Sequence, residues 1–389
     1  MKKDRFTGYG LLTLSKRCLE RRWLVPCLYV ILACLVTSCQ QDKPKKIRIG
    51  LSINLSGYSG SPGEDIRDGA ILAVKEINRH QTSRKLELIV KDDRNTPEGV
   101  KKADKELIRA GCDVIIGHSH SQNTLVAYPL VTGAGRILIT AYTATSKLSK
   151  IDDLFLRTSV DNFLYARSFA KLFRTRQIKN ILLVLDLSNP SFSKDLSDKL
   201  RKHFGNEIKE AYINTQKGVN WPLVVKQILR AMPDGVFMIT EVKSTAILSQ
   251  MLREAGYNGR FFATIWAQGP YLAIYGGKAV EGMEIVSFIR SRYDNVFYEK
   301  FEQELKRQFS KRASPKSARA YELIYILADA MNRCGNKADN PVCIKDKLIS
   351  GNYNFLLGRV RFDRFGDVQR PIFSLKMVKG HFKLVQRLF

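Results

Sequence analysis

The sequence lacks the short motifs that mark many enzymes. It contains no G-x-S-x-G nucleophile elbow, no H-E-x-x-H zinc motif and no Walker loop, and the tripeptide GAG at 133–135 is too short for a dinucleotide fingerprint. Only five histidines occur, and His118 and His120 in "GHSH" have no third candidate metal ligand nearby. We therefore predict a protein that is not an enzyme and that carries no cofactor and no metal.

Acidic residues are scarce beside basic ones. The chain has 64 Lys and Arg against 37 Asp and Glu, a formal net charge of +27. Such a charge is typical of proteins that meet nucleic acid or an anionic surface. The basic residues are spread from Lys46 to Arg387 rather than gathered on one segment, so we interpret them as a solvated basic surface.

Long apolar runs are also scarce, and the longest reads from Trp23 to Ser38. It is shorter than the roughly 20 residues that a membrane helix needs, and it follows a basic stretch, which is typical of a secretory signal. The segment Val36–Cys39 resembles the bacterial lipobox, which implies a signal peptide of residues 1–38, a lipid on Cys39 and a tether of residues 39–45. The alternative is an uncleaved anchor helix. Both interpretations place the remaining chain in the cell envelope, outside the cytoplasm, which argues against a nucleic-acid partner.

Cysteine is scarce in the exported part of the chain. Besides Cys39, only Cys112, Cys334 and Cys343 remain after the signal segment. A disulfide is chemically allowed outside the cytoplasm, and Cys334 and Cys343 flank a short polar loop, so they are the candidate pair. Cys112 then has no partner and abuts the apolar run VIIG, which favours a buried free thiol.

From Lys46 onward, strand-like and helix-like segments alternate. The spacing of Ile66, Ala70, Val74 and Ile77 is close to the helical period. The first series of predicted strands is 46–54, 86–93, 112–117 and 137–140, with helices at 64–80, 97–111 and 121–134. The second series has helices at 163–176, 193–205, 222–232 and 244–256, with strands at 180–186, 209–214, 235–240 and 260–267. This alternation predicts an α/β fold with two similar Rossmann-like lobes built on parallel sheets.

The loops that follow the predicted strands are rich in Ser, Thr, Asn and Gly, as in NLSGYSGSPGE, HSHSQNT and AYTATSK. Ligands of open parallel sheets bind beyond the carboxyl ends of the strands, where these loops lie. Hydroxyls, free backbone N–H groups and a following helix N-terminus favour a carboxylate or another anion. These loops therefore indicate a binding site for a small polar solute.

Several segments together resemble the type I periplasmic solute-binding proteins, especially the branched-chain amino-acid (Leu/Ile/Val) binding group of ABC importers. The resemblance is carried by IRIGLSINLSG, GAILAVKEIN, DDRNTPEGVKKADKEL, VIIGHSHSQNT and ILITAYTATS, and later by NWPLVVKQILRAMPDGVFM, VEGMEIV and LLGRVRFDRFGDVQRPIFSLKMVKGHF. It spans the chain from about residue 46 to the C-terminus in the family's order. Lipid-anchored members of the family fit Cys39.

The resemblance implies a type I clamshell in which two lobes, joined by a three-crossing hinge, close over a solute and present it to a membrane permease. The crossings are expected near 158–161, 286–289 and 359–362. The implied N-terminal lobe comprises residues 46–160 and 288–359, and the C-terminal lobe residues 161–287 and 360–389.

In amino-acid-binding relatives, a serine after the third strand and hydroxyl and backbone groups after the fourth hold the solute carboxylate. The resemblance gives Ser121 the first role, for which the alternative is a simple helix N-cap. The resemblance gives the second role to the segment Tyr142, Thr143, Ala144 and Thr145. Within this segment, Thr143 and Thr145 compete for the same role.

The second lobe matches the family less well. Relatives place an aromatic residue at the position of Phe192, but the loop ATIWAQG offers no carboxylate for a solute ammonium. Its Trp266 is either a stacking wall or a core residue. Glu241 is either a substitute ammonium partner or a solvated glutamate. In the first loop, Tyr58 compensates for an aromatic that relatives carry nearby.

These expectations define an extracytoplasmic substrate-binding lipoprotein of an ABC importer that captures an amino acid or a related carboxylate or amide. Its expected partners are the small-molecule solute, an ABC permease in the inner membrane, and the membrane lipid around its anchor. The alternative is a ligand-sensing or regulatory envelope lipoprotein with the same fold and no transport role. The basic surface and the loop without a carboxylate favour this alternative.

Overall fold

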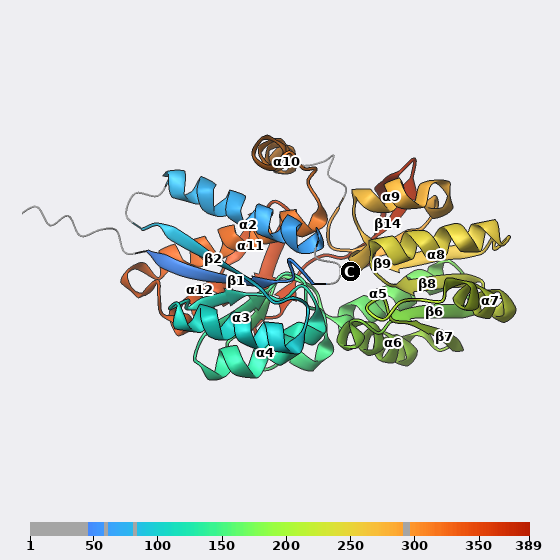
Figure 1. The fold of residues 1–389 in the computed structure, drawn as a ribbon, viewed down its shortest axis with the longest axis horizontal. Helices are drawn as coiled ribbons and strands as arrows, with labels where there is room; N and C mark the ends of the chain where they lie inside the picture. The colour runs from blue at the N-terminus through green and yellow to red at the C-terminus, as the bar shows by residue number, and fades with distance from the viewer. Residues whose placement is uncertain (1–45, 58–60, 81–83, 291–295) are drawn as a thin grey trace, which may run out of the picture. The chain divides into compact units, whose positions relative to one another are not determined.

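Two mainly parallel sheets organise the chain in the computed structural model (Figure 1). The structure describes residues 46–57, 61–80, 84–290 and 296–389. Residues 46–389 form one compact unit. The predicted signal peptide, Cys39, the tether and Tyr58 lie outside the described residues.

The first sheet contains five parallel strands in the order β2-β1-β3-β4-β5. All but one residue of β1 are buried, because helices cover both faces of the sheet. Its strands are β1 (Ile47–Ile53), β2 (Leu86–Asp92), β3 (Val114–Ile116), β4 (Ile137–Thr140) and β5 (Phe155–Arg157).

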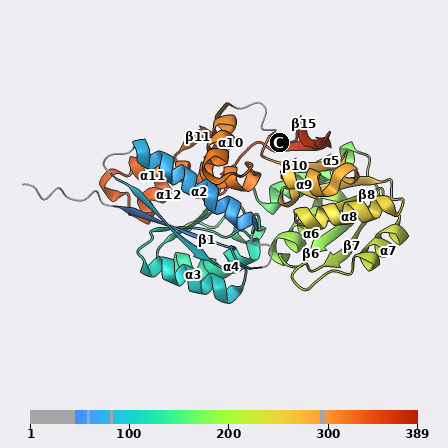
Figure 2. The ribbon, with the colours of Figure 1, turned by 45° about the horizontal axis from the view of Figure 1, so that its top comes forward.

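Helices α2 and α11 lie on one face of this sheet, and α3 and α4 lie on the other (Figures 1 and 2). We call the sheet and the elements around it the first lobe. Its helices are α2 (Ser61–His80), α3 (Pro97–Arg109), α4 (Ser121–Gly133), α10 (Val296–Phe309), α11 (Pro315–Arg333) and α12 (Pro341–Ile349), with short 3-10 turns η1 (Ser146–Leu148) and η5 (Gly335–Lys337).

The second sheet has the order β15-β14-β10-β9-β8-β6-β7, in which β14 and β15 are antiparallel and the others parallel. Its strands are β6 (Ile181–Asp186), β7 (Ile208–Ile213), β8 (Gly235–Ile239), β9 (Arg260–Thr264), β10 (Glu284–Ser287), β14 (Phe373–Val378) and β15 (His381–Arg387). With its helices it makes the second lobe.

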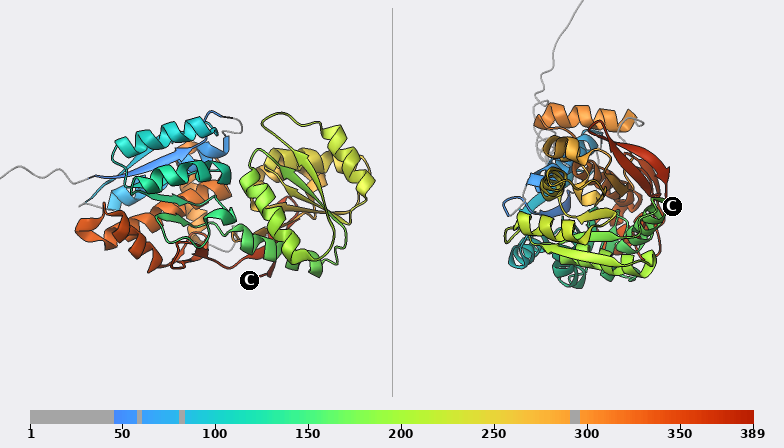
Figure 3. Two further views of the ribbon diagram at one scale, coloured as in Figure 1. Left: turned by 90° about the horizontal axis from the view of Figure 1, so that it is seen from below. Right: turned by 90° about the vertical axis from the view of Figure 1, so that its right-hand side faces the viewer.

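Helices cover both faces of the second sheet as well (Figure 3). Side chains of α5 and α6 pack on one face, and those of α7 and α8 pack on the other. Alternate residues of β6 are therefore buried against opposite layers of helices. These elements are α5 (Asn162–Thr175), α6 (Pro190–Phe204), α7 (Trp221–Ala231), α8 (Val242–Glu254), α9 (Pro270–Gly276), η2 (Ile265–Ala267) and η3 (Gly277–Val280). The α/β fold with parallel sheets is therefore confirmed.

The chain passes between the sheets after β5, after β10 and before β14. Residues 359–362, where we expected the third crossing, lie instead in a small antiparallel sheet, and the chain enters the second sheet only at Phe373. That small sheet consists of β11 (Asn352–Phe355), β12 (Gly358–Phe362) and β13 (Val368–Gln369).

Side chains from all three passages meet in a buried cluster, which we call the hinge cluster. Arg370, in the third passage, forms an ion pair of 2.8 Å with Glu322 of α11 and packs over the ring of Phe288, in the second. Arg319 of α11 also packs over the Phe288 ring, and it donates to the hydroxyl of Ser159 in the first passage at 3.2 Å. Because the charged groups are almost fully buried, they are held by these contacts rather than by water.

The cysteines divide into a bonded pair and a free thiol. Cys334, at the end of α11, and Cys343, in the first turn of α12, form a disulfide with a Cα–Cα distance of 6.0 Å. Cys112 is free and buried, and burial raises the pKa of its thiol to about 11. The Cys112 thiol is therefore protonated and unreactive at neutral pH.

A second buried charge network ties the loops of the first lobe together. His118, after β3, has Nδ1 2.7 Å from Asp93 and Nε2 3.2 Å from Asp104 of α3, and all three side chains are fully buried. Burial alone would lower the pKa of His118, but the two carboxylates outweigh it and raise the pKa to about 10. His118 is therefore an imidazolium that bridges two elements, with both ring nitrogens engaged.

We expect His118→Gln to lower the free energy of unfolding by about 3–5 kcal/mol, because it leaves two buried carboxylates without their cation. Urea unfolding at pH 7 measures this loss. The same substitution at the exposed His203 is the matched control and should change stability by less than about 0.5 kcal/mol. Equal effects at the two positions would contradict the charged network.

The network also predicts a pH dependence. The pKa of His118 is raised from about 6.5 in the unfolded chain, so its contribution to stability is complete below about pH 6.5 and is lost as the pH rises through about 10. Between pH 7 and 10 the free energy of unfolding should therefore fall more steeply for the wild type than for His118→Gln. Parallel profiles would mean that His118 is neutral in the folded protein.

Candidate functional site

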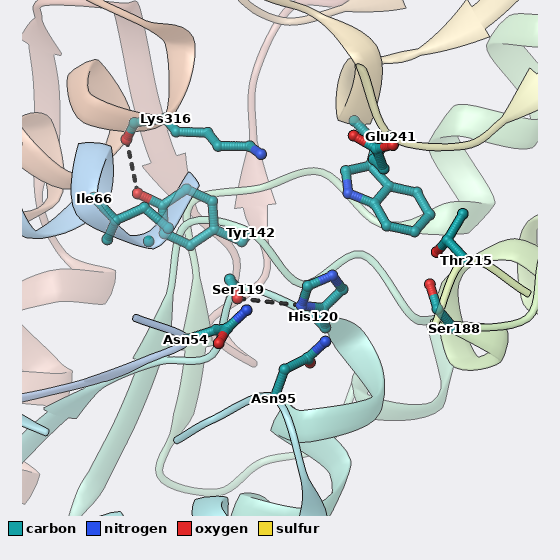
Figure 4. Close-up of a pocket in the computed structure, with 12 residues that line it drawn as sticks. Asn54, Ile66, Asn95, Ser119, His120, Tyr142, Ser188, Thr215, Glu241 and Lys316 are labelled. Carbon is teal, nitrogen blue, oxygen red and sulfur yellow. Dashed lines mark hydrogen bonds between the residues drawn. The ribbon is translucent and has the colours of Figure 1, made fainter. Parts of the chain in front are cut away.

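A pocket lies where the loops after the strands of the first sheet meet those of the second (Figure 4). In parallel sheets this edge is where ligands bind. The first lobe contributes Asn54, Gly63, Ile66, Asn95, Ser119, His120, Tyr142 and Lys316, and the second lobe Ser188, Thr215, Glu241 and Trp266.

Aromatic rings form one wall of the pocket and join the two lobes. Trp266 meets His120 edge-to-face with centroids 5.7 Å apart, and it meets Phe192 in the same way at 5.8 Å. Trp266 is half-buried and lines the pocket, whereas Phe192 is buried behind it. Trp266 is thus part of the pocket wall, and Phe192 packs against Trp266 from behind.

The neighbouring His120 is neutral. Burial lowers its pKa to about 4, and the positive charge of Lys316 adds to this effect. Its Nδ1 lies 3.2 Å from the hydroxyl of Ser119. At neutral pH His120 therefore offers the pocket an uncharged ring beside Trp266.

Lys316 supplies the positive charge of the pocket. It lies in the first turn of α11, and its ammonium points across the pocket in Figure 4. Burial lowers the pKa of Lys316 to about 8, although Glu241 and Asp65 act in the opposite direction. Its backbone carbonyl accepts a hydrogen bond of 2.8 Å from the hydroxyl of Tyr142, so the loop after β4 and the start of α11 are joined beside the pocket.

The hydroxyls predicted to hold a carboxylate point into the protein. The Ser121 hydroxyl accepts the backbone N–H of Ala144 at 3.2 Å, and the N-cap position of α4 belongs to His120. Thr143 shares a hydrogen bond of 2.5 Å with Thr124, and Thr145 caps the turn η1. These three hydroxyl-bearing side chains are almost fully buried and do not line the pocket, whereas the adjacent Tyr142 does.

Glu241 lines the pocket from the second lobe while capping a helix. It is the N-cap residue of α8, and its carboxylate accepts the N–H groups of Lys243 and Ser244 at 2.9 and 2.8 Å. From the sequence, Glu241 is either a partner for a solute ammonium or a solvated glutamate. The structure adds a third role, the capping of α8. Glu241 and Lys316 line the pocket from different lobes, so the pocket has an acidic side chain and a basic one.

Direct contacts join the lobes beside the pocket. The N–H of Gln122, in the first turn of α4, donates to the side chain of Asn189 at 3.2 Å, and Gln122 also bonds with Ser191. Nearer the first passage, the N–H and hydroxyl of Ser146 both donate to Asp195 of α6, at 2.7 and 2.6 Å.

Sequence reasoning missed most of the polar lining. Asn54 and Ser188 stand in loops whose composition we singled out, but nothing in the sequence distinguished them from their neighbours. Lys316 was missed because it comes from the start of a helix more than 170 residues after the loop with which it makes contact. A signal was nevertheless present, since Ser314-Pro315 is a helix-start pattern.

No group of three or more metal-ligating side chains occurs among the residues that the structure describes. Within the same ranges, no helix is both long and apolar enough to cross a membrane.

Comparison with known proteins agrees with the α/β fold described above. A family model described as periplasmic binding protein matches residues 46–381. No curated protein matches the chain in sequence.

Several solved structures share the fold. A leucine binding protein LivK from Thermotoga maritima MSB8 has a TM-score of 0.79 at 19% identity, over 88% of this chain and 98% of its own. LivJ from Streptococcus pneumoniae, solved in complex with isoleucine, has a TM-score of 0.79 at 16% identity, over 88% and 99%. A solute binding protein of an ABC transporter from R. palustris, in complex with benzoate, has a TM-score of 0.80 at 15% identity, over 88% and 96%.

The cap at α8 can be tested apart from any ligand. Glu241→Ala removes the acceptor of two backbone N–H groups and should lower the free energy of unfolding by about 1 kcal/mol. Glu241→Gln keeps an acceptor oxygen and should cost less than half as much. Urea unfolding of both variants compares them, and equal losses would show that the charge, not the cap, stabilises the helix.

Proposed function

The chain belongs to the periplasmic binding protein family, whose members are not enzymes, and from this we propose that it is the extracytoplasmic solute-binding protein of an ABC importer. The observation that carries the proposal is the pocket, which polar loops of both lobes line at the strand ends of both sheets. A solute bound there contacts both lobes, so binding favours their closure. The closed complex would then be presented to an inner-membrane permease.

The solute that fits best is an amino acid or a related carboxylate or amide. Lys316 in the first lobe and Glu241 in the second offer opposite charges, and amide and hydroxyl groups line the same pocket. Among proteins of similar fold, one is named as leucine-binding and others were solved with isoleucine or benzoate. These names describe those proteins, and they support a small carboxylate as the first class to try.

Ser121 and the segment Tyr142–Thr145 keep a role in this proposal. The bond from Ala144 to the Ser121 hydroxyl fixes the loop that carries Tyr142 into the pocket. Ser121 is thus proposed as a positioning residue, and Tyr142 as the contact residue of this segment. Glu241 and Trp266 complete the site from the second lobe, with Phe192 behind Trp266.

We further propose that Cys39 carries a lipid that anchors the protein in the cell envelope. The support is the lipobox-like segment after a short apolar run. The alternative of a regulatory lipoprotein without transport rested partly on the absence of a carboxylate from the loop after β9. Glu241 lines the pocket instead, so that argument for the alternative no longer holds.

A thermal-shift screen of residues 40–389, which contain the compact unit, tests the binding function. Amino acids, small amides, aromatic acids and dicarboxylates are the panel. A ligand that binds the folded state at 100 times its Kd stabilises it by about 2.7 kcal/mol, so one class should raise the melting temperature by several degrees.

The control is the same panel against Trp266→Ala, which removes the shared aromatic wall and should abolish most of the shift. If a folded protein, free of co-purified ligand, responds to no member of the panel, solute capture of this class is excluded and the regulatory alternative gains.

A further inference from the structure

Resting on the proposed function, we infer that the ligand is a small organic anion whose carboxylate pairs with Lys316 and whose apolar body lies against the wall of Trp266 and His120. The inference changes the group that recognises the anion. The sequence resemblance gives that role to the hydroxyls after β3 and β4, whereas the geometry points to an amine at the start of α11.

The first step is that Lys316 has no protein partner for its ammonium. Among the described residues, no hydrogen bond or ion pair reaches its Nζ, although the side chain lies within the pocket. Lys311, five residues earlier, shows the usual arrangement, since its Nζ is 2.9 Å from both Glu64 and Asp68. An ammonium withdrawn from water without a counter-ion is costly, and a ligand carboxylate would supply that counter-ion.

The second step is that the predicted hydroxyls are withdrawn from the pocket. Ser121, Thr143 and Thr145 are at most 1% exposed, and none of them lines the pocket. Thr145 caps the next turn. A carboxylate in the pocket therefore meets the amine before it meets these groups.

The third step concerns the charges around Lys316. His120, the N-cap residue of α4, is neutral, so it neither repels a cation nor forms an ion pair with an anion. Glu241 on α8 and Asp65 on α2 are the carboxylates that act on Lys316, and Arg319 on its own helix is the nearby cation. The two N–H groups hold the Glu241 carboxylate at the start of its own helix, and no bond joins it to the Lys316 ammonium among the residues that the structure describes.

The last step is the shape of the remaining wall. Trp266 stands edge-on to His120, and Ile66 and Tyr142 complete the first-lobe side. These surfaces favour an aromatic or branched apolar body over a sugar or a dicarboxylate.

Isothermal titration of residues 40–389 with matched acids and amides tests the inference. The probes are benzoate and benzamide, 4-hydroxybenzoate and 4-hydroxybenzamide, and 4-methylpentanoate and 4-methylpentanamide, with leucine as the zwitterion. We expect the wild type to bind at least one acid and to bind its amide about tenfold or more weakly. Lys316→Met, which keeps the length and removes the charge, should bring acid and amide to similar affinities.

Two further variants complete the design. Lys316→Arg should restore part of the preference for the acid, because the charge returns. Lys105→Met removes an exposed lysine of α3 and should leave both affinities unchanged. A cooperative melting transition of each variant without ligand would show that it is folded.

The pH profile gives a readout that a purely structural role would not move. Because the pKa of free Lys316 is about 8 and an anion raises it, wild-type affinity for the acid should be constant below about pH 7 and fall as the pH rises through 8. Affinity of Lys316→Met for the same acid should be flat between pH 6 and 9.

The outcomes separate the two proposals. If the wild type binds an acid and Lys316→Met binds it equally well with the same pH profile, the inference is wrong and solute capture stands. If the wild type binds amides as tightly as acids, the inference is also wrong. If no probe binds to the folded wild type, the proposed capture of small carboxylates fails, and the inference fails with it.

Discussion

The buried ion pair between Arg370 and Glu322 is the contact on which the relation between the two lobes depends. It joins the third passage of the chain to α11, and the same guanidinium packs over Phe288 of the second passage and approaches the carbonyl of Thr158 in the first at 3.4 Å. Charges this deeply buried are stable only as a set, because the loss of one member leaves another unpaired. The three passages are therefore fixed at one point, and the loops that line the pocket are positioned from there.

The pocket and the hinge cluster are physically continuous. Tyr142 lines the pocket, hydrogen bonds to the Lys316 carbonyl and lies 4.7 Å from the guanidinium carbon of Arg319. Arg319 in turn contacts Phe288 and Ser159 in two of the passages. A solute that displaces or holds Tyr142 thus acts on a residue two contacts from the hinge. These packed groups connect the pocket wall by direct contact to two of the three passages.

Most of the fold could be predicted from the sequence, because parallel strands buried on both faces and amphipathic helices leave strong periodic patterns. The strands and helices expected between residues 46 and 267 all form, although the last strand ends three residues early in η2, and the short strand β5 was not predicted. Beyond residue 267 we assign no elements from periodicity, and the expected third crossing at 359–362 falls within β12. The site was predicted only in outline. Trp266 and Tyr142 do line the pocket, but a loop sequence does not reveal which hydroxyls turn inward, as those of Ser121 and Thr143 do, or that Lys316 arrives from a distant helix.

The contacts of Ser146 with Asp195, and of Gln122 with Asn189, have a consequence for kinetics. They join the two walls of the pocket directly, so a captured molecule leaves no faster than these bonds break. The protein's own opening rate is then an upper limit on the release rate, and chemically different solutes share that limit. Release of the solute would accordingly depend on opening these contacts, rather than on competition for the solute itself.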